Sequence, residues 1–253
     1  MLSSARARVL ATILTTAAVP AALAGADGSG IAPPKETPAS IVVGFVGGFV
    51  RHDNARHGPV QLAAHLRGSA PKGTHIQVFE NRRRKNAYQT ILALLDRNHD
   101  GLLSNEEKAD ARIILFGQSW GAAAAVLLAR DLNRAGIPVL LTVQVDSIPK
   151  FWQNDKVIPE NVAAAVNFYQ PHGIVHGQPE ITAADPSRTQ ILGNYRFDYK
   201  KEPVRCEDVS WSDRFFTPGH AQSECDPRLW AQIEALVRQR LESQPSTGGE
   251  AQR

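Results

Sequence analysis

The sequence predicts an α/β fold with a mostly parallel central sheet and helices on both faces. Apolar runs of strand length alternate with segments of helical periodicity along most of the 253 residues. Strands that alternate with helices imply right-handed crossovers, which place successive strands parallel in one sheet. The length also suffices for one α/β domain with a large core. We therefore expect a single domain over residues 41–241.

Five apolar runs have the length and composition of buried strands. They are residues 41–46, 75–79, 112–116, 139–145 and 162–169. Helical periodicity lies between them and at the end of the chain, over residues 59–66, 86–95, 121–135 and 228–241. Gly136 and Pro138 predict where the third helix ends.

Residues 147–217 fit this alternation poorly, because the stretch is long and rich in Pro, Asp and aromatic residues. It contains one further candidate strand at 189–199. A long segment at the active-site end of a sheet is typical of a lid or a substrate wall. Ordinary surface loops would explain the composition equally well.

The first 24 residues have the layout of a secretory signal peptide. Arg6 and Arg8 precede an apolar run that ends in the small-residue motif at 22–24. The run is short for a bilayer span and no stop-transfer pattern follows, so an uncleaved anchor is the less favoured alternative. We expect a signal peptide at 1–24, a flexible leader at 25–40, a disordered tail at 242–253, and a secreted or periplasmic protein with no transmembrane segment after cleavage.

The net charge gives no reason to expect a nucleic-acid partner. The formal charge is +3, and cleavage removes Arg6 and Arg8 but no acidic residue, which leaves a charge of about +1. A charge this small does not create a strong long-range field. We therefore predict no nucleic-acid binding.

Cys206 and Cys225 are the two cysteines of the chain. An oxidising compartment favours their pairing. A bridge that closes a loop of about 20 residues contributes roughly 3 kcal/mol in the chain-entropy model. Two free buried thiols are the alternative. We predict the disulfide, with His220 inside the loop that it closes.

The most informative motif is Gly117-Gln118-Ser119-Trp120-Gly121, which lies between a predicted strand and an alanine-rich predicted helix. A Gly-x-Ser-x-Gly motif in this context forms a sharp strand-to-helix turn that exposes the serine hydroxyl above the end of the sheet. The glycines leave room for the neighbouring strand and helix. The motif predicts that Ser119 is a nucleophile.

On this motif the chain resembles the α/β-hydrolase superfamily, and within it the lipase- and esterase-like members. The resemblance covers roughly residues 41–241. It implies a catalytic triad in the chain order Ser, acid, His. It also implies an oxyanion hole made from backbone amides near the nucleophile and after an early strand.

Two residues are candidates for the acid of the triad. Asp146 ends a predicted strand, so its carboxylate reaches the same sheet edge as Ser119. Asp185 follows the next strand along the chain, which is the other position that such hydrolases use. It precedes Pro186 in a sequence typical of a turn, so we favour Asp146.

His220 lies just before the last predicted helix, where the superfamily places its histidine. The chemistry needs a neutral imidazole whose second nitrogen is held by a carboxylate. His172 and His176 are alternatives that come too early in the chain. We therefore predict His220 as the base.

The expected oxyanion hole uses the amide of Trp120 and a second amide from the turn after the first strand, at Gly48 or Phe49. Gly47 and Gly48 let the backbone approach a substrate closely. The segment lacks the histidine that precedes the glycines in the usual motif of these enzymes.

Residues 96–107 match the EF-hand calcium pattern at every specified position. The expected ligands are Asp96, Asn98, Asp100, the carbonyl of Leu102, Ser104 directly or through water, and Glu107. The same residues also read as an Asp-Gly turn followed by a capping box that begins a short helix. We predict a structural calcium ion, and no organic cofactor.

The sequence thus predicts an exported serine hydrolase of carboxylic esters, with a small-molecule or lipid ester as substrate. Thioesterase, peptidase or acyltransferase activity would use the same groups. A non-catalytic, calcium-dependent binding protein on a hydrolase scaffold is the second hypothesis. The acyl-chain length and the oligomeric state do not follow from the sequence.

Overall fold

The computed structural model describes residues 40–206 and 218–243. The predicted signal peptide at 1–24 lies outside the described residues, as do residues 25–39 of the leader and 244–253 of the tail. In the part of the chain that is described, no helix is both long and apolar enough to cross a membrane.

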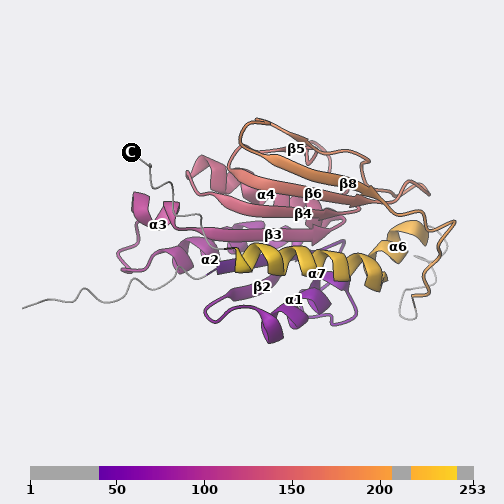
Figure 1. The fold of residues 1–253 in the computed structure, drawn as a ribbon, viewed down its shortest axis with the longest axis horizontal. Helices are drawn as coiled ribbons and strands as arrows, with labels where there is room; N and C mark the ends of the chain where they lie inside the picture. The colour runs from indigo at the N-terminus through magenta and orange to yellow at the C-terminus, as the bar shows by residue number, and fades with distance from the viewer. Residues whose placement is uncertain (1–39, 207–217, 244–253) are drawn as a thin grey trace, which may run out of the picture. The chain divides into compact units, whose positions relative to one another are not determined.

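A six-stranded sheet forms the centre of the domain, with the strand order β2-β1-β3-β4-β6-β8 (Figure 1). Every pairing between neighbouring strands in it is parallel. The strands are β1 (Ser40–Val46), β2 (His75–Glu80), β3 (Arg112–Gln118), β4 (Val139–Val145), β6 (Val162–Tyr169) and β8 (Gln190–Arg196). Two short strands, β5 (Val157–Ile158) and β7 (Thr182–Ala183), pair outside this sheet.

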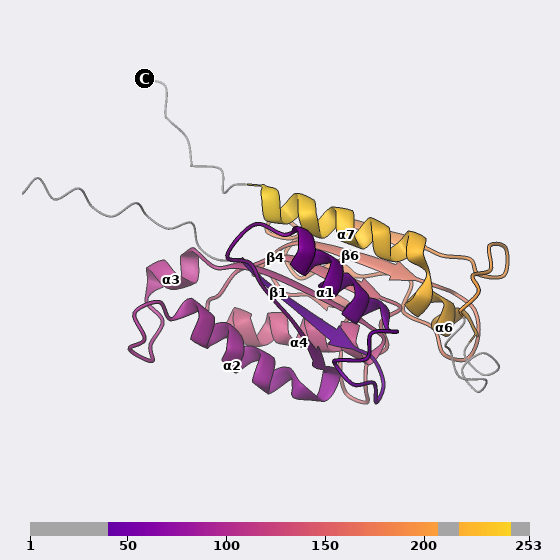
Figure 2. The same cartoon turned by 90° about the horizontal axis from the view of Figure 1, so that it is seen from below.

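Helices cover both faces of the sheet, as Figure 2 shows. One face carries α1 (Gly58–Ser69) and α7 (Pro227–Glu242), and the other carries α2 (Arg84–Leu95) and α4 (Trp120–Arg134). The remaining helices of the described residues are the 3-10 turn η1 (Asn81–Arg83), α3 (Asn105–Ala109) and α6 (Pro218–Cys225). The predicted α/β fold class is confirmed.

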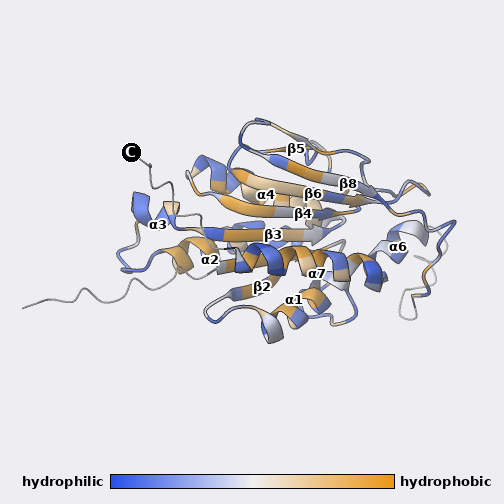
Figure 3. Cartoon of the chain, in the orientation of Figure 1, coloured by the Kyte–Doolittle hydropathy of each residue, from blue (hydrophilic) through white to orange (hydrophobic). Residues whose placement is uncertain are grey.

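The alternation of side chains along each strand divides the core into two layers. In β3, Ile113 and Leu115 pack with α2 and α4, whereas Ile114 and Phe116 pack with α1 and α7. Because both faces are covered, β3 and β4 are buried at nearly every position. Most of their residues are apolar, and Figure 3 shows this as orange along much of each strand. The strands predicted from these runs are confirmed, and the observed ends differ by at most two residues for the first five of them.

The disulfide between Cys206 and Cys225 is formed, with the Cα atoms 5.9 Å apart. It ties the segment after β8 to the end of α6, the helix that contains His220. The poorly alternating stretch supplies β5, β6, β7 and β8, and its part at 207–217 lies outside the described residues.

Two glycines of α1 allow a test of the packing between α1 and α7. A Cβ atom at Gly58 would overlap the indole ring of Trp230, whereas one at Gly68 would have no atom within 4 Å. We expect Gly58→Ala to lower the free energy of unfolding by about 1–3 kcal/mol through overpacking. The control Gly68→Ala should raise it by up to about 1 kcal/mol, because alanine is the better helix former. Urea denaturation measures both, and equal effects would contradict the close packing.

Candidate active site

Ser119 lies in a tight turn between the end of β3 and the start of α4. Its backbone has φ 58° and ψ −128°, a conformation that side-chain-bearing residues rarely adopt, and its amide donates to the carbonyl of Val145 at 2.9 Å. A Cβ atom at Gly117 would overlap the backbone of Gly121, and one at Gly121 would overlap that of Phe45. The two glycines of the motif are therefore needed to close the turn around the serine.

Asp146 follows β4 directly and is fully buried. Its Oδ2 atom lies 2.7 Å from Nδ1 of His220, and this atom also accepts a hydrogen bond from the Gln170 amide group at 3.1 Å. Its Oδ1 atom accepts from the backbone amides of Gly177 at 2.6 Å and Gln170 at 3.2 Å. Four polar contacts thus fix the carboxylate, and the carboxylate in turn orients the imidazole ring.

His220 comes from α6, far along the chain from the strands that it faces. The helix approaches the sheet closely at Gly219, where a Cβ atom would overlap the side chain of Gln170. The disulfide of Cys206 and Cys225 holds the other end of α6. These contacts bring a residue from the end of the domain to the carboxyl edge of β4.

The far nitrogen of the ring, Nε2, lies 3.3 Å from the side-chain nitrogen of Gln118, the residue before Ser119. With Nδ1–H donated to Asp146, this nitrogen is the acceptor of the neutral ring. Within the described residues, the hydroxyl of Ser119 has no hydrogen-bond partner. The ring of His220 therefore lies against the turn that carries Ser119, and the Gln118 side-chain amide is at its acceptor nitrogen.

Asp185 does not lie with these groups in the structure. Its Oδ1 atom accepts hydrogen bonds from the amide of Ser187 at 2.9 Å and from the hydroxyl of the same residue at 2.6 Å. These hydrogen bonds lower the pKa of Asp185. The contacts are those of an Asp at a turn, as its sequence indicates.

The two alternative histidines have other partners. Nε2 of His172 lies 2.8 Å from a carboxylate oxygen of Asp198, and this hydrogen bond lowers the pKa of Asp198. Nδ1 of His176 lies 3.2 Å from the carbonyl oxygen of Gly177. Of the three histidines considered, His220 is the one placed at the end of β3 and β4.

The turn after β1 lies against the nucleophile turn. A Cβ atom at Gly47 would be 2.9 Å from Cβ of Ser119. Gly48 has φ 44°, and its carbonyl oxygen accepts a hydrogen bond from the Asn81 side chain at 2.6 Å. The ring of Phe49 meets that of Trp120 edge-on, with centroids 5.5 Å apart. The three residues predicted to form the oxyanion hole thus lie around Ser119.

Gln170, Asn81 and Gln118 are site residues that the sequence analysis missed. Gln170 and Gln118 are polar residues at the carboxyl ends of buried strands, and that position was the available signal. Asn81 directly follows β2 and has the same signal. Their partners at this edge lie 24, 33 and 102 residues away along the chain for Gln170, Asn81 and Gln118, so no local pattern identifies the contacts.

The predicted calcium loop connects α2 to the capped helix α3. The capping box of Ser104 and Glu107 is present, and Gly101 has φ 80° at the sharp turn. Asp96 accepts hydrogen bonds from the amides of Asp100 at 3.2 Å and Gly101 at 2.9 Å. The backbone amides at Ser104 and Arg97 lower the pKa of Glu107.

The donor set of this loop consists of oxygen atoms, which is the chemistry that calcium prefers. Among the described residues, no three Asp, Glu, His or Cys side chains converge in a way that would hold a metal ion. The carboxylates of Asp96 and Glu107 instead accept hydrogen bonds from loop amides. The residue types fit the ion, and calcium binding stays a prediction.

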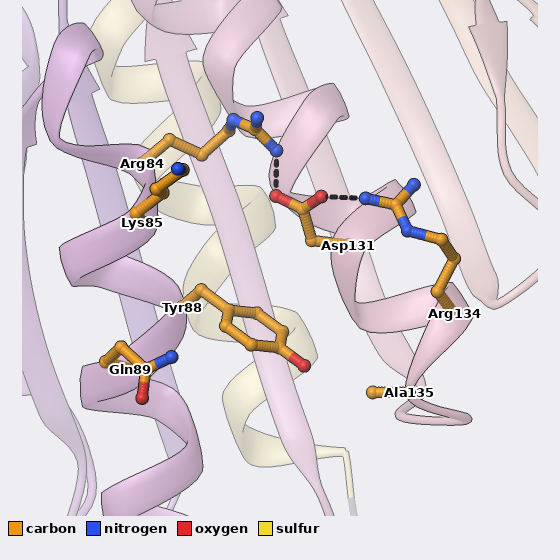
Figure 4. Close-up of a pocket in the computed structure, with 7 residues that line it drawn as sticks. All are labelled: Arg84, Lys85, Tyr88, Gln89, Asp131, Arg134 and Ala135. Carbon is orange, nitrogen blue, oxygen red and sulfur yellow. Dashed lines mark hydrogen bonds and ion pairs between the residues drawn. The ribbon is translucent and has the colours of Figure 1, made fainter.

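A groove of about 490 Å³ lies elsewhere, between α2 and α4 (Figure 4). Arg84 and Arg134 both point to the carboxylate of Asp131 and pair with it. Asp131 is about 16 Å along α4 from Trp120, at 1.5 Å per residue. None of the residues that line this groove is a serine, cysteine or histidine.

No family model matches the sequence, and no curated protein does. Many solved structures resemble the chain, among them the following three. A cutinase-like protein from Cryptococcus sp. is 12% identical, with 83% of this chain and 98% of that chain covered and a TM-score of 0.44. An acetylxylan esterase is 11% identical, with coverage of 81% and 99% and a TM-score of 0.40. Human thioesterase 2 is 11% identical, with coverage of 81% and 97% and a TM-score of 0.40. These likenesses are weak, and the function proposed below rests on the geometry of the site.

Proposed function

We propose that the protein is a serine hydrolase that cleaves carboxylic ester bonds. The observation that supports this proposal is the pair of Asp146 and His220, joined at 2.7 Å beside the strained turn that carries Ser119. A buried carboxylate, an imidazole and a serine at one sheet edge are the groups that acyl transfer needs. Export to the outside of the cell or to the periplasm is part of the proposal, and the disulfide supports it.

In this mechanism the Ser119 oxygen attacks the acyl carbon of the ester while Nε2 of His220 accepts the hydroxyl proton. The imidazolium then gives that proton to the leaving alcohol, and an acyl-enzyme remains. A water molecule attacks the acyl-enzyme with His220 again as base, which releases the acid and restores the serine. Asp146 holds the ring and stabilises its charged form.

Two further groups have roles in these steps. The negative charge on the acyl oxygen is stabilised by the amide of Trp120 and by that of Gly48 or Phe49. The serine hydroxyl takes the place at Nε2 that the Gln118 amide has in the structure. Hydrogen bonds of this kind often form fully only when substrate is bound.

Thioesters are the second substrate class that these groups would serve, and acyl transfer to an alcohol would use the same acyl-enzyme. A binding protein that has lost catalysis is the alternative from a different class. Reaction with a mechanism-based probe separates that alternative from all of the enzymes.

The first test is covalent labelling with a fluorophosphonate probe. We expect the wild-type protein to react at Ser119, because an activated serine attacks phosphorus as it attacks an acyl carbon. Ser119→Ala should not be labelled, and its hydrolysis of 4-nitrophenyl butyrate should fall by a factor of at least about 10³. Mass spectrometry locates the adduct. Folded protein that is not labelled would favour the binding protein.

The second test concerns the acid of the triad. Asp146→Asn should lower kcat by about 10⁴, because the amide no longer holds the imidazole in the productive tautomer. Asp185→Asn is the matched control, since it makes the same change at the competing position. We expect its kcat to stay within a factor of about two. A large loss in Asp185→Asn, with little loss in Asp146→Asn, would exchange the two roles.

We also propose that the loop at 96–107 binds one calcium ion, with ligands from Asp96, Asn98, Asp100, Leu102, Ser104 and Glu107. The ion would stabilise the crossover between α2 and β3, the strand that ends at the nucleophile turn. An exported protein meets calcium at concentrations where sites with a Kd of about 10⁻⁴–10⁻³ M are useful.

Thermal unfolding with calcium or with a chelator tests this site. We expect calcium at about ten times its Kd to stabilise the fold by about 1.4 kcal/mol and so to raise the Tm. Glu107→Gln should abolish the response, because it removes the bidentate ligand charge. Glu106→Gln, an exposed neighbour in the same helix, should respond like the wild type. An unchanged Tm in the wild type would show that the loop's own hydrogen bonds suffice.

A further inference from the structure

A lysine side chain lies beside the nucleophile turn. Lys150 is half-buried in the segment after β4, four residues beyond Asp146 and so near the same edge of the sheet. Its Nζ atom is 4.9 Å from the centre of the Trp120 ring and 2.6 Å from Oδ1 of Asn81. The ammonium group is thus held against the side chain of the residue that directly follows Ser119.

Asn81 fixes the ammonium group relative to the turn after β1. This residue is buried, and its Nδ2 atom donates to the carbonyl oxygens of Val46 at 3.3 Å and Gly48 at 2.6 Å. The amide group therefore cannot rotate without losing these bonds, and its Oδ1 atom stays directed at Lys150. The lysine is thus anchored to the loop that is predicted to stabilise negative charge.

No carboxylate in the described part of the chain neutralises this lysine. Among the described residues, no Asp or Glu side chain lies within ion-pair distance of Lys150. Other cations near this edge are paired, as Arg51 is with Asp53 at 2.8 Å and Arg83 is with Glu80 at 3.4 Å. An ammonium group has three N–H donors, and Asn81 takes one, so two remain for a ligand.

A half-buried cation with free donors is a site for an anion, since burial weakens the screening by water and salt. Phe49, which is 84% exposed, packs edge-on against Trp120, the ring whose centre lies 4.9 Å from the ammonium group, so one exposed apolar side chain belongs to the same cluster. We propose that Lys150 binds an anionic group of the substrate, so that the enzyme selects esters whose acyl or alcohol part carries a carboxylate or a similar charge. This inference rests on the proposed ester hydrolase function.

Two pairs of esters test the inference. The mono-4-nitrophenyl ester of adipic acid, whose carboxylate is too far from the ester for fast ring closure, is compared with 4-nitrophenyl hexanoate, which places a carboxylate on the acyl part. The anion 4-butyryloxybenzoate is compared with the neutral amide 4-butyryloxybenzamide, which places the charge on the alcohol part and keeps one ester bond in each substrate. We expect the wild type to prefer the anionic ester in at least one pair, and the pair that shows the preference identifies the side on which the charge binds.

In that pair, Lys150→Met should lower the ratio of kcat/KM, anionic over neutral, by about tenfold, as expected for one lost hydrogen bond to a charged group. The loss should appear mainly in KM, and high salt should weaken the preference of the wild type. Lys150→Arg should retain much of the ratio, because it keeps the charge. Lys156→Met removes the same charge from a lysine that is already paired with Glu180, and should leave the ratio unchanged.

Each other outcome overturns the inference in a recognisable way. Anion binding is rejected if Lys150→Met leaves the ratio unchanged in both pairs, or if the wild type shows no preference for the charged ester. The ester hydrolase function stands in either case. Equal losses for the anionic and the neutral ester assign Lys150 to holding the loop. Absence of fluorophosphonate labelling at Ser119 rejects the proposed function, and the inference with it.

Discussion

The buried carboxylate of Asp146 is the group on which the carboxyl edge of the sheet depends. A carboxylate without water is costly unless hydrogen bonds replace its hydration. Here Gln170 and Gly177, from the segment after β6, and His220, from α6, supply these bonds. The backbone at Asp146 also has φ 42°, while its amide donates to the carbonyl of Phe168 at 2.7 Å. Backbone strain of this kind persists only where the surrounding contacts fix the residue, and such residues are common at functional sites.

The same edge collects contributions that are distant in sequence. The carboxyl ends of parallel neighbouring strands lie at the same edge of the sheet, and this alone brings the turns after β1, β3 and β4 together. His220 has no strand to position it. It depends on α6, on the disulfide of Cys206 and Cys225, and on the close approach at Gly219. The sheet therefore fixes the positions of Ser119 and Asp146. The position of His220 is fixed by the disulfide and by the packing of α6.

The sequence was sufficient where a local rule applies. Apolar periodicity predicts the strands and helices, and the flanking glycines of the motif predict the turn at Ser119. The position of Asp146 at the end of a strand predicts that its carboxylate lies at the same sheet edge. His220 was predicted from the chain order of a resembling superfamily, since no local property separates it from His172. The side-chain contacts of Gln170 and Lys150 could not be predicted, because they join segments whose relative positions only the folded chain defines. The EF-hand pattern is different, because the sequence match at residues 96–107 is strong. The described side chains there form hydrogen bonds within the loop, and they do not converge on an ion site.

The charges around Ser119 are arranged in the way that the proposed reaction requires. During attack, positive charge would form on the imidazole and negative charge on the acyl oxygen. Asp146 is bonded to the imidazole, and Lys150 is bonded through Asn81 to the loop beside the serine. The effect of Lys150 on a transient oxyanion would be the same for every ester, whereas its effect on a permanent anion in the substrate would depend on the ester. Because Lys150 keeps two donors after its hydrogen bond to Asn81, a group that is already charged in the bound ester is the partner that would use them fully.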